Sequence, residues 1–365
     1  MAEVKKPQNG KGVALVALGM CALFFVLFFL GLVKYYGKSY AATEMTDAFK
    51  DIKTQLDMLK DALETIFKDK SGFGLSVASI ILSIAFPFVS IVWFIMFFIR
   101  VLFCWKPLSA ASNEKITWEE AADQMDKKVR NYVKEVLGYI VCAFMMCGGA
   151  VEISAFGIIF AIAAIGYYIG RRAFDDKAMI SNGQMKSYLL NVGYTALKAI
   201  SLFLVIIYAL KSPLMVGVVG YVIDALIGFL AKKEMGDIIK LSILPFVGML
   251  LAYLALGKAT NAIESHVQTK EEKAKKFTKG GLILSIIATV FTAVYYMFIL
   301  SKDQGRLSFA DWFKGPGEYF VMVTIFFAVS CAVFLFEKLI AVLTGAPVVN
   351  AEAEAEAAAT EDKAE

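Results

Sequence analysis

The amino-acid sequence predicts an all-α protein, a polytopic transmembrane bundle of about eight spans (eight or nine) built from helical hairpins. Two observations lead to this prediction. The chain of 365 residues is 59% hydrophobic and only 19% charged, whereas soluble domains are about 45–50% apolar and about 25% charged. Several apolar runs also approach or exceed the roughly 18 residues that a membrane-spanning helix needs. We therefore expect lipid to surround most of the protein.

A polar tail, 1–12, precedes the first apolar run at 13–33. The apolar core of a signal peptide is about 7–15 residues long, and this run is longer. We interpret it as a retained first transmembrane span.

Residues 43–70 have a different pattern, in which apolar side chains recur alternately after four and three positions. This seven-residue repeat predicts an amphipathic helix between the first two spans. One interpretation is a coiled coil that oligomerises the protein outside the bilayer. The other is a helix that packs on its own chain or lies on the lipid headgroups. The seam consists of Met45, Phe49, Ile52, Leu56, Leu59, Leu63 and Ile66.

The second span is predicted at 75–104, where Pro87 removes one backbone hydrogen bond and is expected to kink the helix. After this span, Thr117 and Glu120 have the spacing of a capping box, which marks the start of a helix. One apolar face then continues along the polar segment 113–135. We interpret this segment as an amphipathic helix on the membrane surface.

The run 136–170 is apolar apart from Glu152. A single helix over this run would be about 52 Å long, against a hydrocarbon core of about 30 Å. The helix must therefore break, and Gly148 and Gly149 are the natural position. We expect a hairpin of two spans with Glu152 near its tip, either as a third polar group of a translocation path or as a solvated side chain.

The central hairpin, 189–231, contains the strongest functional signal. Its two spans are expected to fold back on each other at residues 211–213. Lys198 and Asp224 lie at similar sequence distances from this turn, so two antiparallel helices would bring them to the same depth. Ionisable residues are costly in lipid and mark a function or tight internal packing. We predict an intramembrane Lys198–Asp224 ion pair, which is either a static bridge between helices or an ion or proton site.

Two pairs of glycines predict close helix packing, because small residues at every fourth position let a neighbouring helix approach. Gly220 and Gly228 lie on the same helix face as Asp224. Gly166 and Gly170 form the second pair, which we expect at an internal helix contact.

The distribution of Lys and Arg indicates the topology, because cytoplasmic loops carry more of both. It is most uneven if 241–257 is a re-entrant or short segment, which gives eight crossings with both termini in the cytoplasm. Nine full crossings are the alternative. The other predicted segments are a charged loop at 258–280, two spans at 281–300 and 319–343, and a disordered acidic tail at 351–365.

Several classes of function are disfavoured. The chain has one histidine, His266, and neither a phosphate-binding loop nor a Gly-x-Ser-x-Gly motif, so we expect no enzyme, no bound metal and no cofactor. Its five cysteines show no Cys-x-x-Cys spacing, so no zinc site of that kind is implied. Basic residues are scattered among nearly as many acids, and we expect no nucleic-acid partner.

The leading hypothesis is an integral membrane protein that translocates a small solute or an ion through its bundle, with Lys198 and Asp224 as the coupled pair. The alternative is a non-catalytic assembly subunit. Such a subunit would form a homo-oligomer or bind another membrane protein through the heptad helix and the glycine faces. The expected location is a cell membrane, and the excess of Lys over Arg fits a bacterial inner membrane.

Overall fold

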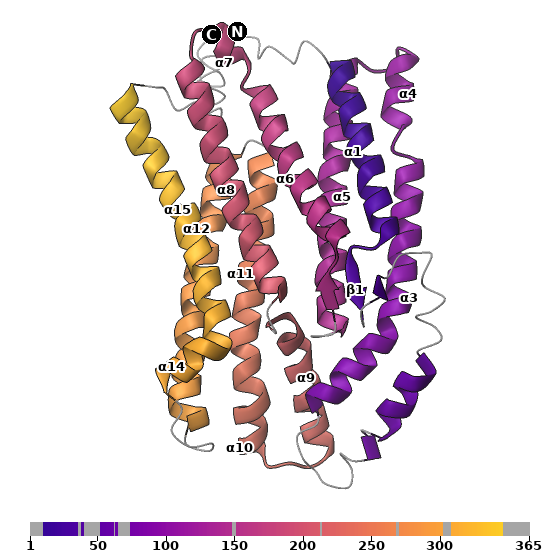
Figure 1. Cartoon of the computed structure of the whole chain (residues 1–365), viewed down its shortest axis with the longest axis vertical. Coiled ribbons are helices and arrows are strands. Elements are labelled where there is room, and N and C mark those ends of the chain that lie inside the picture. The colour runs from indigo at the N-terminus through magenta and orange to yellow at the C-terminus, as the bar shows by residue number, and fades with distance from the viewer. Residues whose placement is uncertain are drawn as a thin grey trace, which may run out of the picture.

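Long helices make up almost all of the structure, a computed structural model (Figure 1). Within the residues that it describes, seven helical stretches are long and apolar enough to cross a membrane. The predicted fold class, an all-α bundle of membrane-spanning helices, is therefore confirmed. The described residues are 10–35, 38–39, 52–61, 63–64, 74–147, 151–211, 214–267, 270–301 and 308–345.

The long helices run up and down through the bundle, and α1 begins at the same end of the bundle at which α15 finishes (Figure 1). We call this the terminal end and the opposite one the distal end. The helices that run toward the distal end are α1 (Gly10–Leu30), α5 (Trp118–Cys147), α8 (Met185–Lys211), α9 (Leu214–Leu230) and α12 (Glu271–Val294). Those that run back are α3 (Gly74–Leu102), α6 (Ala155–Asp175), α11 (Leu244–Val267) and α15 (Glu318–Thr344).

Shorter elements extend or join these helices. The short α-helices are α4 (Lys106–Ser112), α7 (Ala178–Ser181), α10 (Met235–Ile238) and α14 (Phe309–Trp312). Three segments at the distal end depart from a regular α-helix: the π-helical η2 (Ile239–Ile243) and η3 (Tyr295–Leu300), and η4 (Phe313–Gly317), which is kinked at Gly315. π-Helical turns are rare and frequently occur at functional sites.

A small sheet follows α1. Strand β1 (Val33–Tyr35) pairs antiparallel with both β2 (Lys38–Ser39) and β3 (Val151–Ile153), in the order β2-β1-β3. Beside it, the hydroxyl of Ser154 donates a hydrogen bond of 2.6 Å to the carbonyl oxygen of Gly31. The sheet therefore joins the end of α1 to the connection between α5 and α6.

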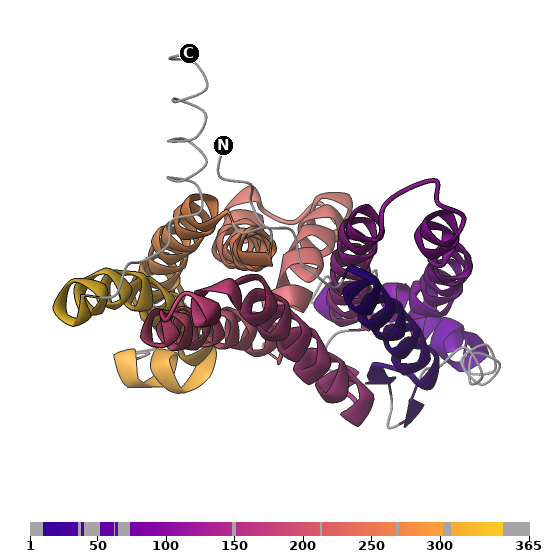
Figure 2. The ribbon, with the colours of Figure 1, turned by 90° about the horizontal axis from the view of Figure 1, so that it is seen from above.

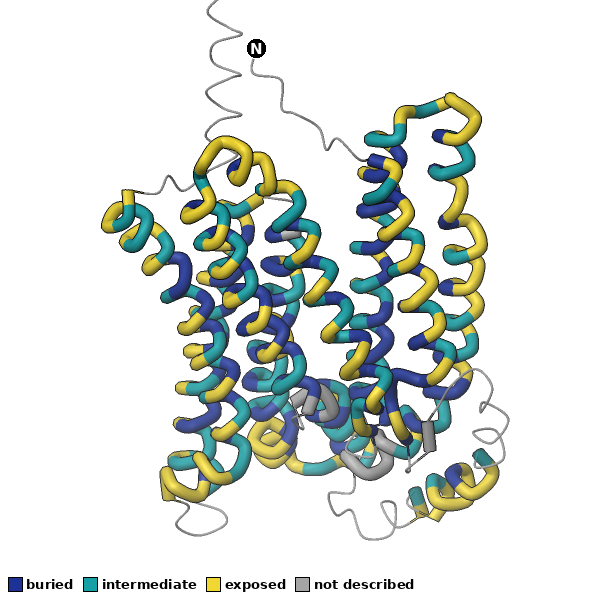
Figure 3. The backbone as a smooth tube through the Cα atoms, turned by 45° about the horizontal axis from the view of Figure 1, so that its top comes forward, coloured by how far each residue is buried: buried dark blue, intermediate teal, exposed yellow. Residues whose placement is uncertain are grey.

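The outer surface of the bundle carries many large apolar side chains, and exposed residues alternate with buried ones along the helices (Figure 3). Val16, Ile162, Leu226 and Val342 are each more than half exposed. An apolar surface of this extent is unfavourable in water. It fits contact with the acyl chains of a lipid bilayer.

Two groups of helices lie side by side when the bundle is seen from the terminal end (Figure 2). One group contains α1, α3 and α5, and its core is rich in aromatic rings: the ring of Phe28 lies 4.8 Å from that of Tyr139 and 5.3 Å from that of Phe97. Such aromatic contacts add to the apolar area that they bury. The other group contains α11, α12 and α15, and α6 and α8 lie along one side of the bundle.

Helices α8 and α9 do not fold back on each other. Helix α9 continues in the direction of α8 and packs mainly on α3 and α11 (Figure 1). The predicted central hairpin is therefore wrong. Pro213 comes directly before the first residue of α9, and proline is tolerated at a helix start because the N–H that it lacks has no partner there. A Ser-Pro pair thus precedes a new helix as readily as it precedes a turn.

Residues 241–257 do not re-enter. They belong to an apolar helical stretch from Met235 to His266 that is long enough to cross a membrane. Helices α8 and α9 together make one pass where two were predicted, and α11 makes a full pass where a re-entrant or short segment was predicted. The total therefore stays at about eight passes. The segment 258–280 is mostly helical and not a loop, because α11 continues to Val267 and α12 begins at Glu271.

Helix α5 does not lie on the membrane surface as predicted for 113–135. It is one continuous helix that stands beside α1 in the bundle. Its predicted capping box is present: the Thr117 hydroxyl accepts from the N–H of Glu120 at 3.2 Å, and the Glu120 carboxylate accepts from the N–H of Thr117 at 3.3 Å. Its buried charge has a partner on another helix, since Asp126 accepts a hydrogen bond of 2.8 Å from Tyr167 of α6.

Candidate functional site

Lys198 of α8 is buried, with 1% of its side chain exposed. Its ammonium group donates to Glu271 at 3.3 Å and to Glu337 at 3.2 Å. It also lies 4.5 Å from the centre of the Phe334 ring, close enough for a cation–π contact. One lysine therefore connects α8 with both α12 and α15.

Further charged groups surround Glu271. A guanidinium nitrogen of Arg172 lies 3.8 Å from its carboxylate, and another donates to Asp176 at 3.1 Å. The Nδ1 atom of His266 lies 3.3 Å from Glu271, and its ring stacks on Phe334 with 5.5 Å between the centres. Neither ring nitrogen of His266 has a hydrogen-bond partner among the described residues. We call this group the ion cluster: Arg172, Asp176, Lys198, His266, Glu271 and Glu337.

Each carboxylate of the ion cluster is paired, because Asp176, Glu271 and Glu337 each have a cation within 3.8 Å. Removing one partner of a buried ion pair costs about 3–5 kcal/mol, since the other charge is left uncompensated. The cluster joins α6, α8, α11, α12 and α15. This arrangement links five helices by buried and partly buried ion pairs.

Asp224 is not the partner of Lys198, and the predicted ion pair is wrong. The prediction assumed a reversal at 211–213, but α8 and α9 follow each other in one direction (Figure 1). A helix from position 198 to position 224 is up to about 39 Å long, which exceeds the hydrocarbon thickness of about 30 Å. Lys198 therefore lies toward the terminal end and Asp224 toward the distal end.

Asp224 lines a cavity of about 350 Å³ at the distal end, which we call the Asp224 cavity. Its carboxylate accepts a hydrogen bond of 3.0 Å from the hydroxyl of Ser242, and it has no ion-pair partner among the described residues. The other polar residues that line the cavity are Tyr221, Lys233, Asp237, Thr292, Tyr295 and Tyr296. The lining thus combines two carboxylates, one ammonium group and several hydroxyl groups, which suits a cation or a solute that forms hydrogen bonds.

All three irregular segments contribute to the wall of the Asp224 cavity: Ser242 belongs to η2, Tyr295 to η3 and Pro316 to η4. The hydroxyl of Tyr295 donates to the carbonyl oxygen of Lys240 in η2 at 2.8 Å. A π-helical turn departs from the regular α-helical hydrogen-bond ladder. The helices α11, α12 and α15 are thus irregular at the place where they meet this cavity.

The glycines have different surroundings. Gly166 and Gly170 are exposed, and a Cβ atom at either would meet no other atom within 4 Å, so the internal contact predicted for them is wrong. Gly220 is buried. At Gly228 a Cβ atom would lie 3.1 Å from Ile238 of α10, so α9 approaches this neighbour closely.

Glu152 lies in β3, opposite Lys34 of β1, and is exposed. Of its two interpretations, the geometry favours the solvated side chain. The structure gives it no place in the Asp224 cavity.

The heptad helix is described over 52–61 and 63–64, whereas Met45, Phe49 and Ile66 lie outside the described residues. Leu56 of the seam is 50% exposed. The buried residue is Gln55, next to the seam, which donates to the hydroxyl of Tyr35 at 2.8 Å. The remaining described seam residues, Ile52, Leu59 and Leu63, are partly buried.

The partners of Lys198 differ from the one that its sequence position predicts, although one signal for them exists. Glu337 is a lone carboxylate inside the apolar run 319–343, and the criterion that singles out Asp224 applies to it equally. Glu271 and His266 fall in the Lys-rich segment 258–280, whose charge predicts a loop and hides the ends of two helices.

Comparisons with protein-family models, with curated proteins and with solved structures find no match for this chain. Its function is therefore inferred from the arrangement of its own side chains.

Proposed function

We propose that this membrane protein translocates a small solute or an ion along α9, α11, α12 and α15, with Asp224 as a binding residue. The Asp224 cavity carries the proposal: within the described residues, a carboxylate without an ion-pair partner lines about 350 Å³ of space in a bundle of apolar helices. Ionisable groups within membrane helices are rare, and they typically mark ion or substrate pathways.

The nature of the lining limits the solute. A volume of about 350 Å³ is near the lower end of the roughly 300–1,000 Å³ found for ligand pockets. The Asp224 carboxylate favours a positive charge, and the hydroxyls of Tyr221 and Thr292 offer hydrogen bonds. These features support a small organic cation or a partly hydrated metal cation as the solute.

The ion cluster supports a closed path at the terminal end. Helices α11, α12 and α15 contribute to both sites, through His266, Glu271 and Glu337 at one end and through the adjoining segments η2, η3 and η4 at the other. A helical unit with a cavity at one end and packed charges at the other fits a transporter that is open to one side. Opening the terminal end would require Lys198 to separate from its two carboxylates.

Flux measurements in liposomes test the proposal. The wild-type protein and Asp224→Asn are reconstituted, and the uptake of protons, sodium, potassium and small organic ammonium ions is recorded. We expect flux of at least one of these in the wild type and a loss of about tenfold or more in Asp224→Asn, because the amide lacks the charge that binds a cation. Glu234→Gln is the matched control, since Glu234 is exposed and does not line the cavity.

Equal flux through the wild type and Asp224→Asn would exclude Asp224 as a binding residue. Absence of flux in every folded variant, for every ion, would contradict translocation of these solutes and favour the assembly role.

The assembly role is the second candidate, and the exposed seam residue Leu56 favours it. A half-exposed leucine in a heptad pattern suits contact with a second copy of the helix. If the protein self-associates there, Leu56→Lys lowers the molecular mass of the particle in detergent solution. Met58→Lys is the control, because Met58 is 51% exposed and lies outside the seam. An unchanged mass in Leu56→Lys would exclude this seam as the contact.

A further inference from the structure

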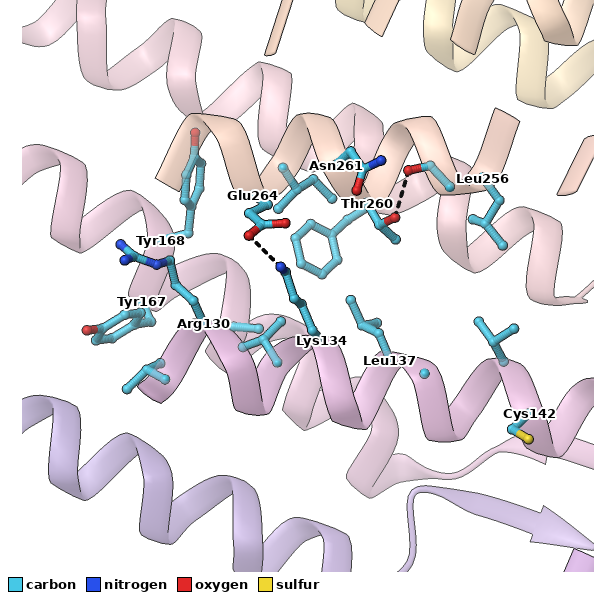
Figure 4. A pocket seen from close by; sticks show the side chains of 18 of the residues that line it. Arg130, Lys134, Leu137, Cys142, Tyr167, Tyr168, Leu256, Thr260, Asn261 and Glu264 are labelled. Atoms are coloured by element: carbon cyan, nitrogen blue, oxygen red, sulfur yellow. Dashed lines mark hydrogen bonds and ion pairs between the residues drawn. The ribbon is translucent and has the colours of Figure 1, made fainter. Parts of the chain in front are cut away.

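A second cavity lies between α5 and α11 (Figure 4), and neither Asp224 nor any residue of the ion cluster lines it. Its volume is about 480 Å³, well within the roughly 300–1,000 Å³ of ligand pockets. Trp93 of α3, Tyr167 and Tyr168 of α6 and Phe203 of α8 also line it. We call it the α5–α11 cavity.

The lining changes from charged to apolar along the cavity. Arg130 and Lys134 of α5 lie with Glu264 of α11 at the side nearer the terminal end (Figure 4). Thr260 and Asn261 of α11 come next, and farther toward the distal end the two helices contribute mainly apolar side chains. This apolar wall consists of Leu137, Val141, Met145, Tyr253 and Leu256. The cavity is therefore amphiphilic, and its polar part faces one membrane side.

The charges of the polar part can accept a ligand without leaving a buried group unpaired. Lys134 reaches across the cavity to form an ion pair with Glu264 (Figure 4). Arg130 hydrogen-bonds Asp126 at 2.6 Å. However, Asp126 also accepts from Tyr167 at 2.8 Å and lies 3.7 Å from Nε of Arg171. Asp126 thus keeps two partners when Arg130 turns toward another anion.

The spacing of the cations fits a phosphate group. Arg130 and Lys134 are four positions apart on α5, so their side chains lie on the same helix face. Arg and Lys are the side chains that most often bind phosphate oxygens, through short charge-assisted hydrogen bonds. Glu264 adds a carboxylate beside them, which complements an ammonium group.

The length of the apolar wall fits one membrane leaflet. From Lys134 to Met145 the helix rises by about 16 Å, which is roughly half of the 30 Å hydrocarbon core. A ligand with its head at Lys134 and its tail at Met145 has the dimensions of a lipid in the leaflet on the terminal side.

We propose that the α5–α11 cavity binds an aminophospholipid from the membrane. Its phosphate lies between Arg130 and Lys134, its ammonium group meets Glu264, and one acyl chain follows the apolar wall. A head that carries both charges matches two cations beside one carboxylate better than a head with a phosphate alone. This site is independent of Asp224 and of solute flux.

Lipid binding to the full-length protein in mild detergent tests the proposal. Delipidated protein is titrated with palmitoyl-oleoyl phosphatidylethanolamine or with the phosphatidylglycerol of the same chains. Native mass spectrometry counts the bound lipids, and the thermal unfolding midpoint reports stabilisation. We expect one tightly bound phosphatidylethanolamine, which raises the midpoint, and weaker binding of phosphatidylglycerol.

Two sets of variants separate the polar part of the cavity from the apolar part. Lys134→Gln is expected to weaken phosphatidylethanolamine binding by about tenfold or more, since it removes a charge-assisted contact. Lys127→Gln is its control, because Lys127 is exposed on the same helix and does not line the cavity. At Gly257, which lines the cavity, a Cβ atom would meet nothing within 4 Å. Gly257→Ala should therefore bind normally, whereas Gly257→Leu fills the space and blocks the acyl chain.

Retention of binding in both Lys134→Gln and Gly257→Leu would overturn the proposal, as would a wild-type protein that binds neither lipid. Equal affinity for the two lipids would overturn the assignment of an amino head group. Because the readout is binding, a failure here is distinct from a failure of Asp224-dependent flux.

Discussion

Lys198 and Glu337 are separated by 139 positions in the chain, yet the Nζ atom of one lies 3.2 Å from the Oε2 atom of the other. Farther toward the distal end of the same two helices, the hydroxyls of Ser201 and Ser330 form a second hydrogen bond. Helices α8 and α15 are therefore joined by polar contacts at two successive levels. In a lipid environment, where apolar side chains gain little by leaving the solvent, such contacts contribute to helix association.

Replacing Lys198 by methionine should lower the stability by about 3 kcal/mol, because the Glu271 and Glu337 carboxylates would lose their shared cation. The loss lies at the lower end of the about 3–5 kcal/mol expected when a buried ion pair is broken. The reason is that the side chains of Glu271 and Glu337 are partly exposed. Thermal or chemical unfolding in detergent measures the effect. Lys186→Met, at an exposed position in the first turn of the same helix, should leave the stability unchanged.

The double variant Lys198→Met/Glu337→Met should recover part of this loss, because apolar replacement of both partners removes one uncompensated charge. If the double variant is less stable than Lys198→Met, the Lys198–Glu337 pair is not the source of the effect.

Replacing Asp126 by asparagine should destabilise the protein by about 2–3 kcal/mol, since Arg130 and Tyr167 donate to this carboxylate within the bundle. The exposed Asp123, three positions earlier on α5, is the control, and Asp123→Asn should be neutral. A helix that lies on the membrane surface would show equally small effects for both. The comparison therefore tests the position of α5.

The sequence reveals the class of this fold but not the directions of its helices. Apolar composition and long apolar runs follow from the lipid that surrounds the helices, so they are visible in the chain itself. The direction of α9 depends on whether the Ser212-Pro213 pair precedes a turn or a new helix, and both are compatible with proline. Packing on α3 and α11 decides between them.

The candidate site is predictable to a similar extent. Asp224 stands out because a carboxylate in an apolar run is costly wherever the run lies. Its neighbours Ser242 and Tyr295 come from two other helices, and no spacing in the sequence connects them. The first half of α5 appears as a surface helix for the same reason, since the partners of Asp126 and Lys134 lie on α6 and α11.

The adjacent glycines Gly280 and Gly281 of α12 should respond in opposite ways to alanine. At Gly281 a Cβ atom would overlap the ring of Phe327, whereas at Gly280 the nearest atom is 3.9 Å away. Gly281→Ala is expected to cost about 1–3 kcal/mol by overpacking. Gly280→Ala should stabilise by about 0.5–1 kcal/mol, because alanine loses less entropy in a helix. Unfolding of the two variants under the same conditions gives the comparison, and equal midpoints would contradict the α12–α15 packing.

Removing the hydroxyl of Tyr295 should affect flux more than stability. The bond from this hydroxyl to the carbonyl oxygen of Lys240 connects two π-helical segments at the Asp224 cavity, and its loss costs about 1 kcal/mol. We expect Tyr295→Phe to change the transport rate in liposomes severalfold while the unfolding midpoint shifts only slightly. Tyr296→Phe is the matched control, because Tyr296 lines the same cavity without a hydroxyl hydrogen bond among the described residues. Identical rates in both variants would show that the π-helical link has no part in transport.

The three-stranded sheet has a consequence for the order in which the protein is made. Strand β1 leaves the ribosome with α1, but its partner β3 is synthesised only after α3 and α5. Contacts between residues so distant in the chain form late in folding. Until then α1 lacks both the β3 pairing and the bond from Ser154 to Gly31. The β1–β3 pairing therefore requires the chain through α5 to have been made, so the sheet couples the end of α1 to passes that are synthesised later.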